Sequence, residues 1–171
     1  MKIRAIVLVA AAVLTCLLAT GRAQAQSIFL EISGVPGEVT TPASFAGQIN
    51  VLALSWGGSK ICTGALNMQD LSFTKSTDKA STFLLGALRD HTVYPTITFR
   101  FVRTDGQVYQ SYQLTNAVVS SMSLGGSAAE PRTTENVTVA FSQVLATYTF
   151  IDGSGKPGAT TSTTVVASSC P

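Results

Sequence analysis

Charged side chains and metal-binding side chains are both scarce in this sequence of 171 residues. Lysine, arginine, aspartate and glutamate together make up 12% of it, about half the usual share. There is a single histidine, His91, which excludes a histidine-rich metal site. No run of basic residues interleaved with aromatics is present, and this argues against a nucleic-acid partner. The composition therefore predicts no metal, no cofactor and no nucleic acid.

Sequence patterns that carry catalysis are also missing. There is no Gly-x-Ser-x-Gly turn around a nucleophilic serine and no Cys-x-x-Cys pair. The aspartates are scattered over predicted turns and strand ends rather than paired, and the Gly-Gly pairs at 57–58 and 125–126 are typical of turns rather than of a phosphate-binding loop. His91 follows the end of a predicted helix, where a capping or surface role is usual. The sequence predicts a protein that is not an enzyme.

The first 25 residues have the pattern of a secretory signal peptide. Met1–Arg4 is basic, 5–19 is almost unbroken apolar sequence, and Ala23-Gln24-Ala25 is the small-x-small pattern at which signal peptidase cleaves. The apolar run is too short to span a bilayer comfortably, so no stable membrane anchor is expected after cleavage. We expect residues 1–25 to be removed and the mature chain, 26–171, to be periplasmic or secreted.

Two of the three cysteines, Cys62 and Cys170, lie in the predicted mature chain. In an oxidising compartment such a pair favours a disulfide, which would tie the end of the chain to a loop near residue 62. Two free thiols, or thiols that bond between molecules, are the alternatives that the sequence leaves open.

Alternation of apolar and polar residues dominates the mature chain and predicts β-strands. Ile28, Leu30 and Ile32 share one face of an opening strand. Residues 48–56 are apolar on both faces, which predicts a central or doubly covered strand. The pattern shifts by one residue at Gln69-Asp70, and this predicts a β-bulge.

One stretch has helical periodicity instead, and we expect a single short α-helix at about 78–89. Its apolar residues fall at i, i+3, i+4, i+7 and i+8: Ala80, Phe83, Leu84, Ala87 and Leu88. Thr77 or Asp78 is expected to cap its N-terminus.

A hairpin follows the predicted helix. Ile97, Phe99 and Phe101 alternate with polar residues before Asp105-Gly106, a pair that favours a type I′ turn. Further strands are expected up to a variable tail that begins at about residue 152. Many short strands with one helix predict a mainly β single domain, a compact barrel or sandwich.

Several stretches of the chain, in the same order, resemble Hcp, the tube protein of bacterial type VI secretion systems. The resemblance covers about residues 28–156 and rests on five stretches: 28–38, 49–57, 67–79, 118–127 and 131–138. The positions that carry it most clearly are Trp56, Gly57, Asp70, Leu71, Ser72, Phe73, Gly125, Gly126, Glu135 and Asn136.

This resemblance implies a compact β-barrel of two packed sheets with one flanking helix. It also implies a non-enzymatic subunit that forms hexameric rings, which stack into tubes and can carry small protein cargo in their lumen. Three features differ from the usual family pattern: the signal peptide, a short connection at 57–67, and a C-terminal segment from 160 that carries Cys170. The alternative function is a secreted monomeric binding module that kept the fold and lost ring assembly.

Overall fold

The computed structural model describes residues 26–60, 66–129 and 131–167, and more than half of them belong to β-strands. The strands are β1 (Ser27–Ile32), β2 (Ile49–Val51), β3 (Ala53–Ser55), β4 (Gly58–Lys60), β5 (Leu66–Met68), β6 (Leu71–Ser76), β7 (Val93–Val102), β8 (Val108–Gly125), β9 (Thr134–Ala140), β10 (Gln143–Ile151) and β11 (Pro157–Val166). A 3₁₀ turn, η1 (Ala43–Phe45), follows β1, and the helix α2 (Ala80–Asp90) lies between β6 and β7.

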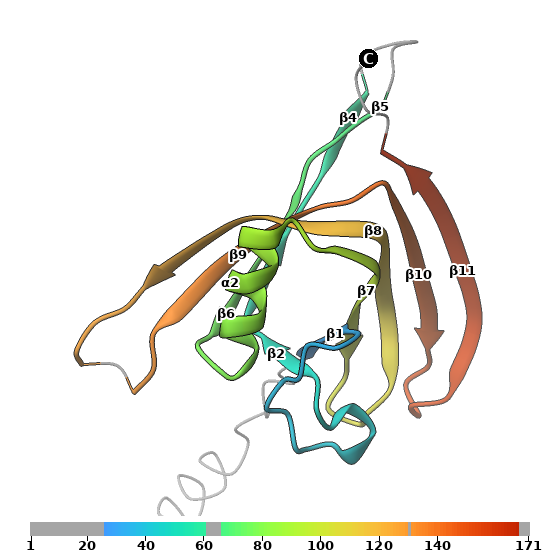
Figure 1. The fold of residues 1–171 in the computed structure, drawn as a ribbon. Helices are drawn as coiled ribbons and strands as arrows, with labels where there is room; N and C mark the ends of the chain where they lie inside the picture. Colours follow the sequence, from blue (N-terminus) through green and yellow to red (C-terminus); the bar gives the residue numbers. More distant parts are fainter. Residues whose placement is uncertain (1–25, 61–65, 130, 168–171) are drawn as a thin grey trace, which may run out of the picture.

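The main sheet runs in the order β2-β1-β7-β8-β9-β6-β3, and every pairing is antiparallel. Only Leu52 separates β2 from β3, so the first and last strands of this order are consecutive pieces of one segment. The Leu52 N–H also donates to the Thr74 carbonyl of β6 at 2.8 Å. The two layers expected of the barrel therefore belong to one curled, hydrogen-bonded sheet (Figure 1).

The inner face of this sheet forms the core and is lined by alternate residues of each strand, as expected of strands buried on one side. Phe73 of β6 and Phe99 of β7 meet edge to face at the centre, with ring centroids 5.4 Å apart. The helix α2 packs against β8 and buries Leu84 and Ala87. The expected mainly β fold with one short helix is confirmed by the strand and helix assignment.

Both ends of the helix are close to their expected positions, since it spans Ala80–Asp90 instead of 78–89. Asp78 fills the capping role, because its carboxylate accepts the Ala80 N–H at 2.9 Å. At the other end His91 adopts a left-handed conformation, with φ of 55°, and its N–H donates to the Ala87 carbonyl. Of the two roles expected for His91, capping or surface, the structure shows the capping role.

Three local predictions were wrong. Residues 48–56 do not form one central strand: the chain breaks at Leu52, whose side chain is exposed where β2 passes into β3. Gln69-Asp70 is not a bulge within one strand but the junction between β5 and β6, which belong to different sheets. The 105–106 turn is not type I′, because Gly106 has a positive φ (85°) and Asp105 does not.

Two strand pairs extend away from the barrel. The short β4–β5 pair forms a separate two-stranded sheet at the 57–67 connection. The β10–β11 hairpin, which we name the ribbon (residues 143–166), attaches through β10 to the first half of β8 and has β11 as its outer strand (Figure 1). The segment expected to be a variable tail from about residue 152 therefore contains β11, which pairs with β10.

Candidate functional site

Strands β6 and β9 bring together the two sequence stretches with the most specific motifs. They pair along their whole length, with Phe73 opposite Val137 and Lys75 opposite Glu135. Leu71, Phe73 and Lys75 point inward from β6, and Glu135 and Val137 point inward from β9. A lysine and a glutamate thus face each other in the interior, beneath the start of α2.

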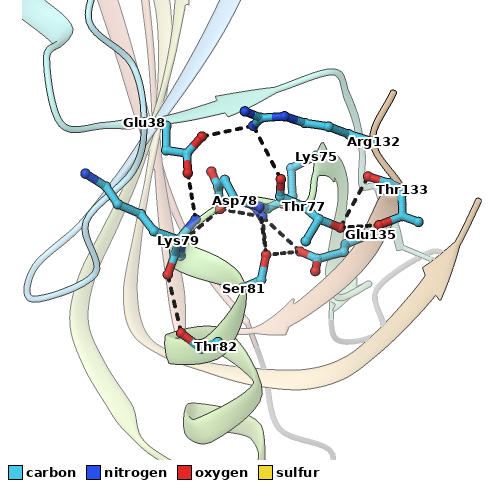
Figure 2. Close-up of polar contacts among 11 residues, drawn as sticks. Glu38, Lys75, Thr77, Asp78, Lys79, Ser81, Thr82, Arg132, Thr133 and Glu135 are labelled. Carbon is cyan, nitrogen blue, oxygen red and sulfur yellow. Dashed lines mark hydrogen bonds and ion pairs between the residues drawn. The ribbon is translucent and has the colours of Figure 1, made fainter. Parts of the chain in front are cut away.

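Lys75 lies at the centre of a buried ionic cluster, which consists of Lys75, Asp78, Ser81 and Glu135 (Figure 2). Its Nζ is 2.7 Å from Asp78 Oδ1, 2.8 Å from Glu135 Oε2 and 3.0 Å from Ser81 Oγ. Ser81 in turn donates to Glu135 Oε2 at 2.8 Å. An ammonium has three protons to donate, and here each one has an acceptor, which is what burial of a charge requires.

A second, more exposed ion pair lies beside this cluster, near the start of α2. Arg132 Nη1 is 2.9 Å from Glu38 Oε2, and the Lys79 N–H donates to Glu38 Oε1 at 3.1 Å (Figure 2). The hydrogen bond from Arg132, followed by the one from the Lys79 backbone, lowers the pKa of the Glu38 carboxyl. These contacts join the loop after β1, the start of α2 and the loop before β9.

Sequence reasoning missed the ionic cluster because charged residues are almost always expected at the surface. A signal was nevertheless present. Lys75 continues the i, i+2, i+4 alternation that begins with Leu71 and Phe73, and Glu135 begins the alternation of Val137 and Val139. Residues of the same parity share one face of a strand, so both charges could have been placed inside.

Trp56, Gly57 and Asp70 lie around the point where the β4–β5 pair leaves the barrel. Trp56 packs edge to face on Tyr112 and Phe141, with centroid distances of 5.2 and 6.3 Å. The Gly57 carbonyl accepts the Gln69 N–H at 2.8 Å, and the Asp70 carboxylate accepts the Ser120 hydroxyl at 2.8 Å. All three residues therefore make contacts that stabilise the point where the β4–β5 pair leaves the barrel.

The remaining motif positions lie on β6, at the end of β8, on β9 and in the loop before β9. Leu71 and Phe73 are core residues, while Ser72 donates to Asn136 Oδ1 at 2.8 Å on the outer face. Gly125 is the last residue of β8, opposite Thr134 of β9, and Gly126 begins the loop that follows. A Cβ on Gly126 would lie 2.5 Å from Thr133 Cγ2, so only glycine fits beside that threonine. These motif positions have structural roles here.

The described part of the chain contains no group of three or more His, Cys, Asp or Glu side chains that could hold a metal ion. Within the same residues, no helix is long and apolar enough to cross a membrane. Cys62, Cys170 and residues 1–25 lie outside the described residues, so the disulfide and the signal peptide stay predictions.

Comparisons with known proteins agree with this fold and these motifs. Residues 29–148 match the family model described as "Type VI secretion system effector, Hcp". Protein hcp1 of Pseudomonas aeruginosa is 40% identical over an alignment of 136 residues, and the match covers 72% of this chain and 83% of that protein. The chain belongs to the Hcp family.

Solved structures of type VI secretion proteins have the same fold. One described as a type six secretion system protein superposes with a TM-score of 0.76 at 27% identity, over 80% of this chain and 92% of that one. Hcp1 from Salmonella typhimurium superposes with a TM-score of 0.73 at 24% identity, over 84% and 95% of the two chains.

Membership of the Hcp family confirms the resemblance and the prediction of a structural, non-enzymatic protein. The chain is a tube or effector protein of the type VI secretion class, a family whose members are secreted. The matched range ends at residue 148, within β10. The outer strand of the ribbon, β11, therefore lies beyond the part of the chain that matches the Hcp model.

Proposed function

We propose that the mature chain, 26–171, is an exported structural and carrier protein that assembles into hexameric rings. In this proposal the signal peptide of residues 1–25 delivers it to the periplasm or beyond, rings stack into tubes, and the lumen holds small protein cargo. Support comes from membership of the Hcp family and from surfaces of the chain that suit contact with further copies.

The observation that carries the proposal is the exposure of the ribbon. Within the described residues β11 pairs only with β10, so the backbone groups on its outer edge are open to a partner strand. The ribbon also exposes large apolar side chains: 48% of Tyr148, 54% of Phe150 and 64% of Val166. A monomer rarely leaves an open strand edge and apolar side chains together.

A second open edge lies elsewhere on the chain. Residues 119–125 of β8 pair with β9 on one side, while β7 on the other side reaches only as far as Val118. Leu124, 68% exposed, lies in this stretch. Two different open surfaces on one subunit favour a head-to-tail contact between copies, and such a contact closes into a ring when the rotation per subunit allows it.

The test is light scattering behind size exclusion, with negative-stain images, on mature protein 26–171. The sample is kept oxidised, and a thiol titration reports whether the predicted Cys62–Cys170 bridge is present. We expect a hexamer-sized ring for the wild type. Phe150→Lys should yield monomer, because it places a charge on the apolar ribbon.

Leu52→Lys is the matched control, since Leu52 is 52% exposed, much as Phe150 is, but lies between β2 and β3 away from the ribbon. It should leave the ring intact. A wild-type protein that stays monomeric over a wide concentration range would overturn ring assembly and support the secreted binding module. Rings that persist in Phe150→Lys would show that the ribbon is not the contact.

A further inference from the structure

The described chain begins at a contact between Gln26 and Tyr109. The Tyr109 hydroxyl donates a hydrogen bond to the side-chain carbonyl oxygen of Gln26 at 2.5 Å. The next residue, Ser27, begins β1 opposite Val102 of β7. The pairing of β1 with β7 therefore fixes the backbone on the C-terminal side of Gln26. The Gln26 side chain is held by Tyr109 of β8, a strand distant in the sequence.

Gln26 lies in a pocket of about 260 Å³ between the 103–109 turn and β10, whose other lining residues include Arg103, Tyr109 and Tyr148. Partial burial raises the pKa of the Tyr109 hydroxyl, and the neighbouring phenols of Tyr112 and Tyr148 raise it further. Tyr109 is thus protonated at neutral pH and remains a hydrogen-bond donor to the glutamine carbonyl.

We propose that Gln26 is a modification site: once it is the N-terminal residue, it cyclises to pyroglutamate, and the Tyr109 hydroxyl polarises the carbonyl that reacts. The inference rests on the proposed export, because cleavage after Ala25 is what gives Gln26 a free α-amino group. It goes beyond that proposal by assigning a chemical fate to the new N-terminus.

The reaction needs no co-reactant. The neutral α-amino nitrogen attacks Cδ of its own side chain, and the new N–Cδ bond closes a five-membered ring. Negative charge develops on Oε1, where the Tyr109 hydroxyl already donates; a positioned donor at a developing oxyanion accelerates such steps. The bond from Cδ to Nε2 then breaks, and Nε2 leaves as ammonia with the proton from the attacking nitrogen.

The product suits the pocket as well as the reactant does. The lactam keeps the carbonyl oxygen, so the acceptor for Tyr109 is retained. It also removes the positive charge of the α-ammonium from Gln26, a residue that lines the same pocket as Arg103, whose Nε is 3.2 Å from Asp105 Oδ2. An uncharged, blocked N-terminus at the start of β1 is the expected mature state.

The rate of cyclisation tests the role of Tyr109. A fusion from which a protease releases Gln26 as the N-terminus would be followed at neutral pH by intact mass, which reports the loss of one ammonia. We expect the folded wild type to cyclise faster than the same chain in urea, and Tyr109→Phe to slow it about five- to tenfold, the loss of one hydrogen bond.

Tyr94→Phe is the matched control, because burial raises the pKa of Tyr94 too but this residue does not line the pocket; its rate should equal the wild type. Equal rates for Tyr109→Phe and wild type would overturn the role of Tyr109. A chain exported from cells that begins at Gln26 and keeps a free amine would overturn cyclisation alone. A chain that begins elsewhere would overturn the predicted cleavage, and this inference with it.

Discussion

Two regions of this Hcp-family chain differ in which side chains they bury and which they expose. At the corner where α2, β6 and β9 meet, even charged side chains are buried, and Lys75 has no exposed surface at all. In the ribbon, almost every residue of β11 is exposed, and β10 carries the exposed Tyr148 and Phe150. The first region satisfies its polar groups within one subunit, whereas the second leaves apolar groups and a strand edge open.

The contrast indicates which part of the sequence specifies the fold and which part is available for contacts with other copies. Burial of a fully satisfied ion pair constrains strand register, because moving either strand by one residue would leave a charge unpaired. Among the described strands, β8 is the only one of the main sheet that pairs with the ribbon, and the family match ends within the first strand of the ribbon. Substitutions in the two regions should therefore have very different effects.

The largest effect is expected at the ionic cluster. Lys75→Met removes the cation that pairs with two largely buried carboxylates, Asp78 and Glu135. Removal of one partner from a buried pair costs about 3–5 kcal/mol, because the remaining charge has no compensation. We expect the free energy of unfolding, measured by urea titration of mature protein, to fall by about that amount.

Two variants act as controls for Lys75→Met. Adding Glu135→Leu should restore part of the lost stability, since it removes one of the uncompensated carboxylates. Arg89→Met breaks an ion pair with Asp90 whose side chains are 78% and 54% exposed, so it should change stability by less than about 1 kcal/mol. If Lys75→Met proved as mild as Arg89→Met, the cluster would contribute little to stability.

A smaller difference in the loss of stability is expected between substitutions at the attached end of the ribbon and substitutions at its free end. Val144 of β10 is 1% exposed and lies opposite Leu114 of β8. Val144→Ala should lower the free energy of unfolding by about 2 kcal/mol through lost burial and a residual cavity. Phe150→Ala, at the exposed end, should change it by less than about 0.5 kcal/mol in the monomer. Equal losses would show that the ribbon packs along its whole length.

Local sequence patterns were sufficient to predict much of the fold. The apolar stripe from Ala80 to Leu88 predicted the helix within two residues, because an amphipathic helix is specified by its own periodicity. The alternation around Phe99 predicted β7 for the same reason. The identity of the fold came from the resemblance of whole stretches to Hcp proteins, which local pattern alone does not supply.

The features that could not be predicted from the sequence depend mostly on contacts between residues far apart in the chain. The break at Leu52 depends on β2 and β3 having different partners, β1 and β6, and no local pattern encodes a change of partner. Likewise the Tyr109 hydroxyl reaches Gln26 across 83 positions of sequence. Exposure of Phe150 also contradicts its apolar pattern, which within one subunit would have predicted burial.

The smallest predicted effect concerns the turn of the ribbon, where Asp152 is exposed. Its carboxylate accepts hydrogen bonds from the Ser154 hydroxyl at 2.6 Å and the Lys156 N–H at 2.9 Å. These hydrogen bonds lower the pKa of Asp152 below the ordinary 3.8, and the one from the Ser154 hydroxyl has the largest effect. A lowered folded pKa contributes stability that is present above 3.8 and is lost as pH falls through the folded value. A carboxyl-carbon NMR titration should therefore show Asp152 titrating below 3.8, and the backbone amides of the turn should shift with the same midpoint. Ser154→Ala should raise that midpoint towards 3.8; a midpoint already at or above it in the wild type would show that the turn does not depend on the carboxylate.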